Sequence, residues 1–256
     1  MAGILDLFRL DGKVAIVTGC NRGIGQGMTQ ALAEAGADIF GISSQAAAQE
    51  TKALVESAGR RFEYMQADLI STKPIPGIFA NAVAAFGHVD ITVNNAGIIR
   101  RNDSTDFTER DWDDVMNVNL KALFFMCQAA ARQYIAQKSG GKIVNVASML
   151  SFQGGIRVPS YTASKSGVKG VTMAMANEWA RHGINTNAIA PGYIATDNTA
   201  ALRADAERNK AILDRIPAGR WGEPSDLAGA VVFLSSKAAD YMNGFTVAVD
   251  GGWLGR

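Results

Sequence analysis

Residues 13–25, KVAIVTGCNRGIG, run from a short apolar segment through three closely spaced glycines. The apolar segment predicts a buried strand, and the residues that follow predict a helix. Gly19, Gly23 and Gly25 allow a tight turn between the two and a close approach of the backbone to a phosphate group. A helix that begins there presents free N–H groups to an anion. The stretch predicts a dinucleotide-binding unit, although the same glycines would also serve a turn that holds no ligand.

The rest of the chain repeats this alternation of apolar runs and helical patterns. Six further apolar runs occupy residues 37–43, 61–67, 89–95, 142–148, 184–190 and 245–251. Helical patterns lie near residues 24–35, 45–58, 77–86, 111–137, 160–181 and 224–236. Continuously apolar strands are typical of a parallel sheet covered on both faces. We therefore predict an α/β fold: a single doubly wound Rossmann domain, residues 1–256, with a seven-stranded parallel sheet and helices on both faces.

Residues 191–221 interrupt the alternation. They are too many for a simple connection, they are polar, and part of them is helical in pattern. Long insertions after the carboxyl end of a strand commonly cover a binding site. We expect a helical substrate lid after the sixth strand.

Composition excludes several classes of protein. The net charge is +1 over 256 residues, with no long basic run, so a nucleic-acid partner is not expected. No signal peptide or membrane span is readable. Cys20 and Cys127 lie in apolar segments, which favours reduced thiols in a cytoplasmic protein over a disulfide. No metal site is expected.

The second strand ends without the acid that usually binds the adenosine ribose. Ser43 and Ser44 occupy that place. A carboxylate would repel a 2′-phosphate, and Arg22 in the glycine-rich turn could pair with one. These residues favour NADP, with NAD also possible. The alternative for Arg22 is a solvated turn residue.

Three polar residues in the stretch 148–165 suggest chemistry. Ser148 ends a strand, and Tyr161 and Lys165 are four residues apart on the predicted helix that follows, so they share a face. A nearby ammonium favours the phenolate and lowers the pKa of tyrosine from about 10. Such a phenol can give or take a proton near neutral pH, and Ser148 could bond the same substrate oxygen. A surface Tyr–Lys pair would look similar.

Several motifs together carry a resemblance to a known family. They are TGCNRGIG, NNAG at 94–97, the asparagine of NVNL at 119, the spacing of Ser148, Tyr161 and Lys165, and PG at 191–192. Over essentially its whole length the chain resembles a compact, seven-stranded short-chain dehydrogenase/reductase. The resemblance implies that Tyr161 is the acid/base, that Ser148 polarises a carbonyl, that Lys165 binds the nicotinamide ribose, and that Asn119 holds a water relay to Lys165. Asn119 as a helix cap is the alternative.

The resemblance also implies a cofactor cleft. Asp68 would border the adenine, Asn95 to Gly97 the adenosine, and Ile194 and Thr196 the nicotinamide amide. The expected set is Gly19, Asn21, Arg22, Gly23, Ile24, Gly25, Ser43, Ser44, Asp68, Leu69, Asn95, Ala96, Gly97, Tyr161, Lys165, Pro191, Gly192, Ile194 and Thr196.

Longer segments, such as SMLSFQGGIRVPSYTASKSG and ILDRIPAGRWGEPSDL, resemble the family's bacterial sugar-acid dehydrogenases. This implies exchange of a secondary alcohol and a ketone on a six-carbon acid, 2-deoxy-D-gluconate or 2-dehydro-3-deoxy-D-gluconate, in hexuronate and pectin breakdown. Arginine binds carboxylates bidentately. We expect at least one of Arg100, Arg101 and Arg157 to hold the substrate carboxylate, unless they are surface charges. Weaker candidates for substrate contacts are Gln153, Asn198 and Arg203.

Other functions remain open at this point. Two alternative enzymes are a gluconate 5-dehydrogenase and a 3-oxoacyl-carrier-protein reductase. A non-enzymatic alternative is a nucleotide-binding redox sensor that catalyses no reaction. The sugar-acid group is generally NAD-linked, whereas Arg22 and the missing acid favour NADP.

Two helical segments suggest self-association. Residues 120–136 and 166–180 are apolar over more than one stripe, whereas a helix that covers one face of a sheet needs only one apolar stripe. The excess predicts a symmetric homo-oligomer, and the resemblance implies a homotetramer.

Overall fold

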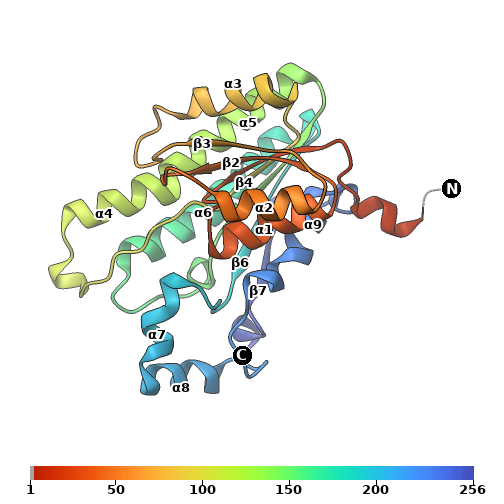
Figure 1. Cartoon of the computed structure of the whole chain (residues 1–256). Helices are drawn as coiled ribbons and strands as arrows, with labels where there is room; N and C mark the ends of the chain where they lie inside the picture. Colours follow the sequence, from red (N-terminus) through yellow and green to blue (C-terminus); the bar gives the residue numbers. More distant parts are fainter. Residues whose placement is uncertain (1–2) are drawn as a thin grey trace.

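The computed structural model describes residues 3–256 and contains one sheet of seven parallel strands (Figure 1). The strand order is β3-β2-β1-β4-β5-β6-β7. Their bounds are β1 Val14–Thr18, β2 Asp38–Ser43, β3 Phe62–Gln66, β4 Ile91–Asn94, β5 Gly141–Val146, β6 Ile184–Pro191 and β7 Thr246–Val249. This confirms the predicted fold class. The order reverses direction between β1 and β4, and such a switch point opens a crevice at the carboxyl ends of the strands.

Helices cover both faces of the sheet. The helices are α1 Gly23–Glu34, α2 Gln49–Ser57, α3 Ile75–Phe86, α4 Glu109–Met116, α5 Leu123–Gln137, α6 Pro159–Trp179, α7 Ala200–Ala204, α8 Ala206–Arg215 and α9 Ala228–Ser235. α1, α2 and α9 share one core cluster, whereas α3, α5 and α6 share another (Figure 1). Every residue of β1 is buried, which explains its continuously apolar sequence.

The helix predicted over residues 111–137 is not continuous. α4 ends at Met116, residues Asn117–Ala122 form a π-helical turn, and α5 begins at Leu123. A π turn inserts an extra residue into the helix and is frequent at functional sites. The turn places Asn119 in the interior, 1% exposed, facing the end of β4.

The segment after β6 carries two short helices. α7 and α8 project away from the sheet (Figure 1). They are held by a small apolar cluster in which Ile212 and Ile216 pack with Met149 and Trp253. The cluster therefore joins this segment both to the turn after β5 and to the chain end.

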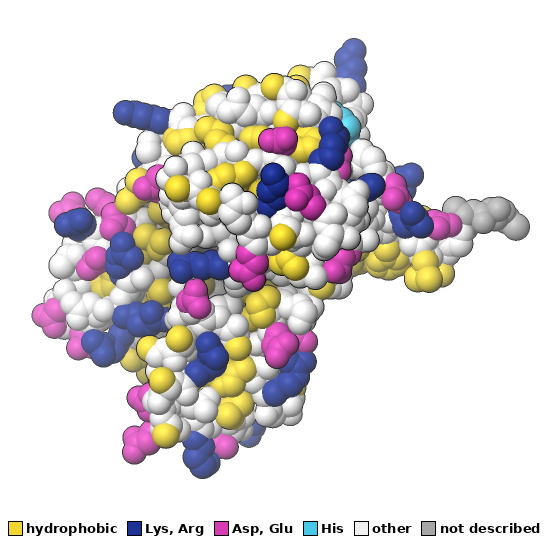
Figure 2. All heavy atoms as spheres, viewed as in Figure 1, with side chains coloured by type: hydrophobic (Ala, Val, Ile, Leu, Met, Phe, Trp, Pro, Cys, Tyr) yellow, Lys and Arg dark blue, Asp and Glu magenta, His cyan; other side chains and the backbone are white. Residues whose placement is uncertain are grey.

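The surface carries mixed charges. Figure 2 shows acidic and basic side chains interspersed over the visible face, in keeping with the small net charge. Within residues 3–256, no helix has the length and apolar character needed to cross a membrane. Cys20 and Cys127 are both free and buried, and burial raises the pKa of each thiol to about 12, so neither is a reactive thiolate.

Candidate active site

The glycine-rich turn lies against the end of β4. Gly19 has a left-handed backbone, φ +67°, and a Cβ on Gly25 would overlap the carbonyl oxygen of Gly19. The Nδ2 of Asn95 donates to the carbonyls of Thr18 and Gly19, at 3.0 and 3.1 Å. Arg22 precedes α1 without a side-chain cap, so no side chain there bonds the first N–H groups of the helix. The turn is thus a backbone cradle that ends in uncapped N–H groups, the kind of donor that helix N-termini offer to anions.

The end of β2 is joined to this cradle by a short chain of hydrogen bonds. Ser43 Oγ accepts from the Gln45 N–H at 3.1 Å, and Gln45 Oε1 accepts from Asn21 Nδ2 at 2.8 Å. Arg22 keeps an exposed guanidinium whose Nη1 lies 3.4 Å from Asp197 Oδ2. No carboxylate stands at position 43 or 44.

The segment after β6 lies over the same turn. The methyl group of Thr196 would be 3.2 Å from a Cβ on Gly23. Ile194 is buried, and Asp68 on the far side caps its own turn by accepting from the Ile70 N–H at 3.0 Å. The predicted cofactor residues therefore lie along the carboxyl edge of the sheet. Their role toward a cofactor stays a prediction.

Ser148, Tyr161 and Lys165 come together between β5 and α6. Ser148 begins a single 3-10 turn, and its Oγ accepts from the Leu150 N–H at 3.1 Å. Lys165 is 3% exposed, and its Nζ donates to the Val146 carbonyl at 2.6 Å. The same Nζ lies 5.6 Å from the centre of the Tyr161 ring. Burial lowers the pKa of Lys165 to about 8.

The pKa of Tyr161 differs from the expectation. Burial raises it above its ordinary value, opposed by the hydrogen bond with Ser148 and by the positive charge of Arg101. The prediction that Lys165 lowers the pKa of Tyr161 is therefore wrong for the protein chain by itself. The reason is that burial lowers the pKa of Lys165 to about 8, so the lysine has already lost its charge at the pH where a phenol with a raised pKa titrates.

Asn119 connects the loop after β4 with α6. Its Oδ1 accepts from the Ile98 N–H at 2.8 Å, and its Nδ2 donates to the Ile98 carbonyl at 2.9 Å and to Ser164 Oγ at 3.3 Å. The Ser164 hydroxyl donates in turn to the Tyr161 carbonyl at 2.8 Å. Asn119 is thus a bridge inside the π turn and not a cap at a helix end. The water relay implied by the resemblance stays a prediction.

The three candidate arginines have different partners. Arg100 is bound to two acids of α4, with Asp111 at 3.5 Å and Asp114 at 3.3 Å. Arg157 pairs with Asp103 at 3.1 Å between Nε and Oδ1. Arg101 donates only to a backbone carbonyl, that of Asn198, at 3.3 Å, and its charge is the one that acts on Tyr161.

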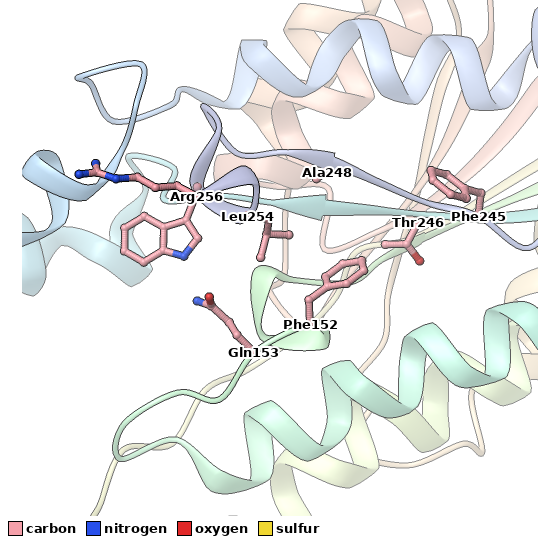
Figure 3. A pocket seen from close by; sticks show the side chains of 8 residues that line it. Phe152, Gln153, Phe245, Thr246, Ala248, Leu254 and Arg256 are labelled. Carbon is pink, nitrogen blue, oxygen red and sulfur yellow. The ribbon is translucent and has the colours of Figure 1, made fainter.

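The weaker substrate candidates are also engaged within the chain. Arg203 donates to the Thr196 carbonyl at 3.1 Å, and Gln153 accepts from Arg215 at 3.3 Å. Gln153 lines a pocket of about 440 Å³ beside β7, opposite Leu254 and Thr246 (Figure 3). Apart from Gln153, none of the predicted site residues lines this pocket, so the pocket is separate from the place where Ser148, Tyr161 and Lys165 meet. Over residues 3–256, no cluster of three or more His, Cys, Asp or Glu is arranged to hold a metal ion.

Comparison with known proteins shows to which family this chain belongs. A family model described as enoyl-(acyl carrier protein) reductase matches residues 19–254. A 2-dehydro-3-deoxy-D-gluconate 5-dehydrogenase from Escherichia coli is 65% identical over 253 residues, covering 99% of this chain and 100% of the relative. The chain belongs to the short-chain dehydrogenase/reductase family. A second enzyme of the same name, from Dickeya dadantii, is 62% identical with the same coverage.

Solved structures of this family agree with the fold. One from Agrobacterium tumefaciens, assigned provisionally as a 2-deoxy-D-gluconate 3-dehydrogenase and containing NADP, is 56% identical with a TM-score of 0.93. It matches 98% of this chain, and the match covers all of that chain. As a member of the short-chain dehydrogenase/reductase family, the chain is an oxidoreductase.

Two buried serines were missed by the sequence reasoning. Ser164 links Asn119 to Tyr161, and Ser151 donates to the Lys165 carbonyl at 2.6 Å. Each lies near a predicted catalytic residue in the sequence. Ser164 directly precedes Lys165, and Ser151 follows Ser148 by three residues. Serine is common in such positions, so only the contacts reveal their partners.

The buried ammonium of Lys165 predicts a pH dependence of stability. The pKa is 10.5 in an unfolded chain and about 8 in the fold, so between these values the unfolded chain binds a proton that the folded chain does not. Stability contributed by neutral Lys165 is therefore absent below pH 8 and gained as pH rises towards 10.5, by about 3 kcal/mol. Relative to Lys165→Met, the parent should gain most of this difference between pH 7 and pH 10 in urea unfolding.

Lys169→Met provides the control, because it removes a half-exposed lysine from the same helix. A stability difference between parent and Lys165→Met that is the same at both pH values would contradict the assignment.

Proposed function

We propose that this chain is an NAD(P)-dependent dehydrogenase that interconverts a secondary alcohol and a ketone on a six-carbon sugar acid, 2-dehydro-3-deoxy-D-gluconate or 2-deoxy-D-gluconate. The observation that carries the proposal is that Ser148, Tyr161 and Lys165 lie together where β5 meets α6, with the charge of Arg101 acting on the phenol. The 65% identity with the E. coli sugar-acid enzyme supports the substrate class.

The turn fits a dinucleotide because close packing at its glycines keeps it tight and no side chain caps the first N–H groups of α1. A Cβ on Gly19 would crowd Ala96, and one on Gly25 would overlap the turn itself. The turn, Ser43 and Ser44, Asp68, residues 95–97 and residues 191–196 would hold the cofactor, with Lys165 at its nicotinamide ribose. The bound nicotinamide supplies the hydride donor and acceptor.

The chain's own groups handle the proton and the substrate oxygen. In alcohol oxidation the Tyr161 oxygen takes the hydroxyl proton, and in ketone reduction it returns a proton to the same oxygen. Ser148 donates a hydrogen bond to that oxygen and holds it beside the phenol. Lys165 holds α6, which carries Tyr161, at the end of β5 through its bond to the Val146 carbonyl.

A panel of substrates tests the proposal. The purified protein is followed at the NAD(P)H absorbance with 2-deoxy-D-gluconate, 2-dehydro-3-deoxy-D-gluconate, gluconate and an acyl ketoester. We expect turnover of the first two with the highest kcat/KM. Activity on the ester alone would favour a carrier-protein reductase, and no activity on any of them would favour the sensor.

We assign the substrate carboxylate to Arg101. Arg100 and Arg157 each have a carboxylate partner already, whereas Arg101 is bound to a single carbonyl and its charge reaches Tyr161. The carbonyl belongs to Asn198, within residues 191–221, so we propose that this segment is the substrate lid of the single domain. Protection of the segment from trypsin by substrate would support the lid, and unchanged cleavage would contradict it.

Arg101→Met should raise KM for the sugar acid by about 10- to 100-fold, because a hydrogen bond to a charged group contributes about 1.5–3 kcal/mol. KM for the cofactor should stay at its parental value. Arg157→Met is the matched control from the neighbouring loop and should change KM for the sugar acid less than Arg101→Met does. An unchanged KM for the sugar acid in Arg101→Met would contradict the assignment of Arg101 to the substrate carboxylate.

We propose NADP as the preferred cofactor, with NAD also accepted. The support is the exposed guanidinium of Arg22 beside an edge that lacks an acid at residues 43 and 44, and the related Agrobacterium protein contains NADP. Arg22 would exchange its long contact with Asp197 for the 2′-phosphate.

Arg22→Ala should therefore weaken NADPH binding by about tenfold or more while leaving NADH binding nearly unchanged, since only the former carries the phosphate. Quenching of protein fluorescence by each cofactor measures both dissociation constants. Equal weakening for the two cofactors would contradict the assignment of Arg22.

We further propose a homotetramer. The support is a groove of about 290 Å³ between α5 and α6, lined by Phe124, Ile135, Val171 and Trp179 among others, on a face where Met173 is 48% exposed. Light scattering should give the mass of four chains, and a monomeric mass would contradict the proposal. A cytoplasmic location stays a prediction from the sequence.

A further inference from the structure

Ser151 ends the 3-10 turn that follows β5, and its hydroxyl has two partners. It donates to the backbone carbonyl of Lys165 at 2.6 Å and accepts from the backbone N–H of Ser148 at 3.3 Å. The residue is 8% exposed. One buried hydroxyl therefore connects two of the residues to which we assign the chemistry.

Lys165 holds this turn at two points. Its Nζ bonds the carbonyl of Val146, two residues before Ser148, and its own carbonyl bonds Ser151, three residues after Ser148. Ser148 lies between these two attachments. Its side chain is also fixed within the turn, because Oγ accepts from the Leu150 N–H. Loss of the second attachment would leave the turn free to pivot against α6 about the first.

The hydroxyl is not needed to complete the helix. Lys165 is inside α6, where a carbonyl already accepts the N–H four residues on, so the bond from Ser151 is additional. The Ser148 N–H, by contrast, has Ser151 Oγ as its partner, and a buried donor without a partner is unfavourable. The two bonds of the Ser151 hydroxyl therefore fix the position of Ser148 more than they stabilise α6.

We propose that Ser151 is a positioning residue that fixes the Ser148 hydroxyl relative to Tyr161 and Lys165 and so governs the proton-transfer step without touching substrate or cofactor. The proposal rests on the function proposed above and deepens it. A displacement of about 1 Å at a reacting group can cost a large factor in rate, so a hydroxyl behind the site can control kcat.

Ser151→Ala tests the proposal, with Ser166→Ala as the matched control. Ser166 is exposed on α6, and its hydroxyl donates to the Leu150 carbonyl of the turn that contains Ser151, with no bond to Ser148. Ser151→Ala should lower kcat about tenfold with both KM values within about twofold of the parent. Ser166→Ala should keep the parental kcat and both parental KM values.

The pH profile separates positioning from loss of stability. The hydrogen bond with Ser148 lowers the pKa of Tyr161, so a displaced Ser148 should let that pKa rise. In Ser151→Ala the acidic limb of kcat for alcohol oxidation should then move to higher pH, which a merely less stable protein would not show. Parental kcat with an unmoved limb would overturn the proposal. If Ser151→Ala does not fold, Ser151→Cys, similar in size but a weaker donor, takes its place.

Hydrogen exchange tests the contact between the Ser151 hydroxyl and the Ser148 N–H without any substrate. The amide of Ser148 should exchange faster in Ser151→Ala than in the parent and in Ser166→Ala, because its acceptor is lost. Unchanged exchange at Ser148 would overturn the proposal even in an active enzyme. A parent that is inactive on every sugar acid would instead refute the proposed function, while faster exchange at Ser148 in Ser151→Ala would still establish the contact.

Discussion

The bond from the buried ammonium of Lys165 to the carbonyl of Val146 holds α6 against the end of β5. A charged lysine is costly to bury, and this bond together with the neighbouring aromatic ring offsets part of that cost. Without it, the turn that carries Ser148 would be bonded to α6 through the hydroxyls of Ser151 and Ser166. Burial lowers the pKa of Lys165, so keeping its ammonium charged at this junction costs free energy.

A second constraint acts at the switch point of the sheet. Asn95 donates two hydrogen bonds to Thr18 between the ends of β1 and β4, so the glycine-rich turn and the loop that leads to Arg101 start from one junction. Asn119 continues this connection from Ile98 to α6 through Ser164. Hydrogen bonds thus connect the glycine-rich turn, the loop after β4 and α6, and these bonds explain how residues distant in sequence keep a common geometry.

Local patterns predicted the parts of this protein that depend on local physics. Continuous apolar runs indicated buried parallel strands, and the glycine spacing indicated the cradle, because both are set by residues near in sequence. The π turn at Asn117–Ala122 could not be found this way, since it depends on partners in the loop after β4 and in α6. The three arginines looked equivalent until Asp103, Asp111 and Asp114 were placed beside two of them. The pKa of Tyr161 likewise depends on burial, which a spacing of four residues does not reveal.

The overlap that a side chain would create at Gly25 also limits how this protein can be made more heat-resistant. Exchanging a helical glycine for alanine is a standard route to higher melting temperature, since it reduces the entropy of the unfolded chain. In α1 that route is closed at Gly25 by the carbonyl of Gly19 and at Gly27 by Pro224. Gly170 in α6 and Gly229 in α9 have open space around the missing Cβ, so thermostabilisation by design should begin on those two helices and leave the first untouched.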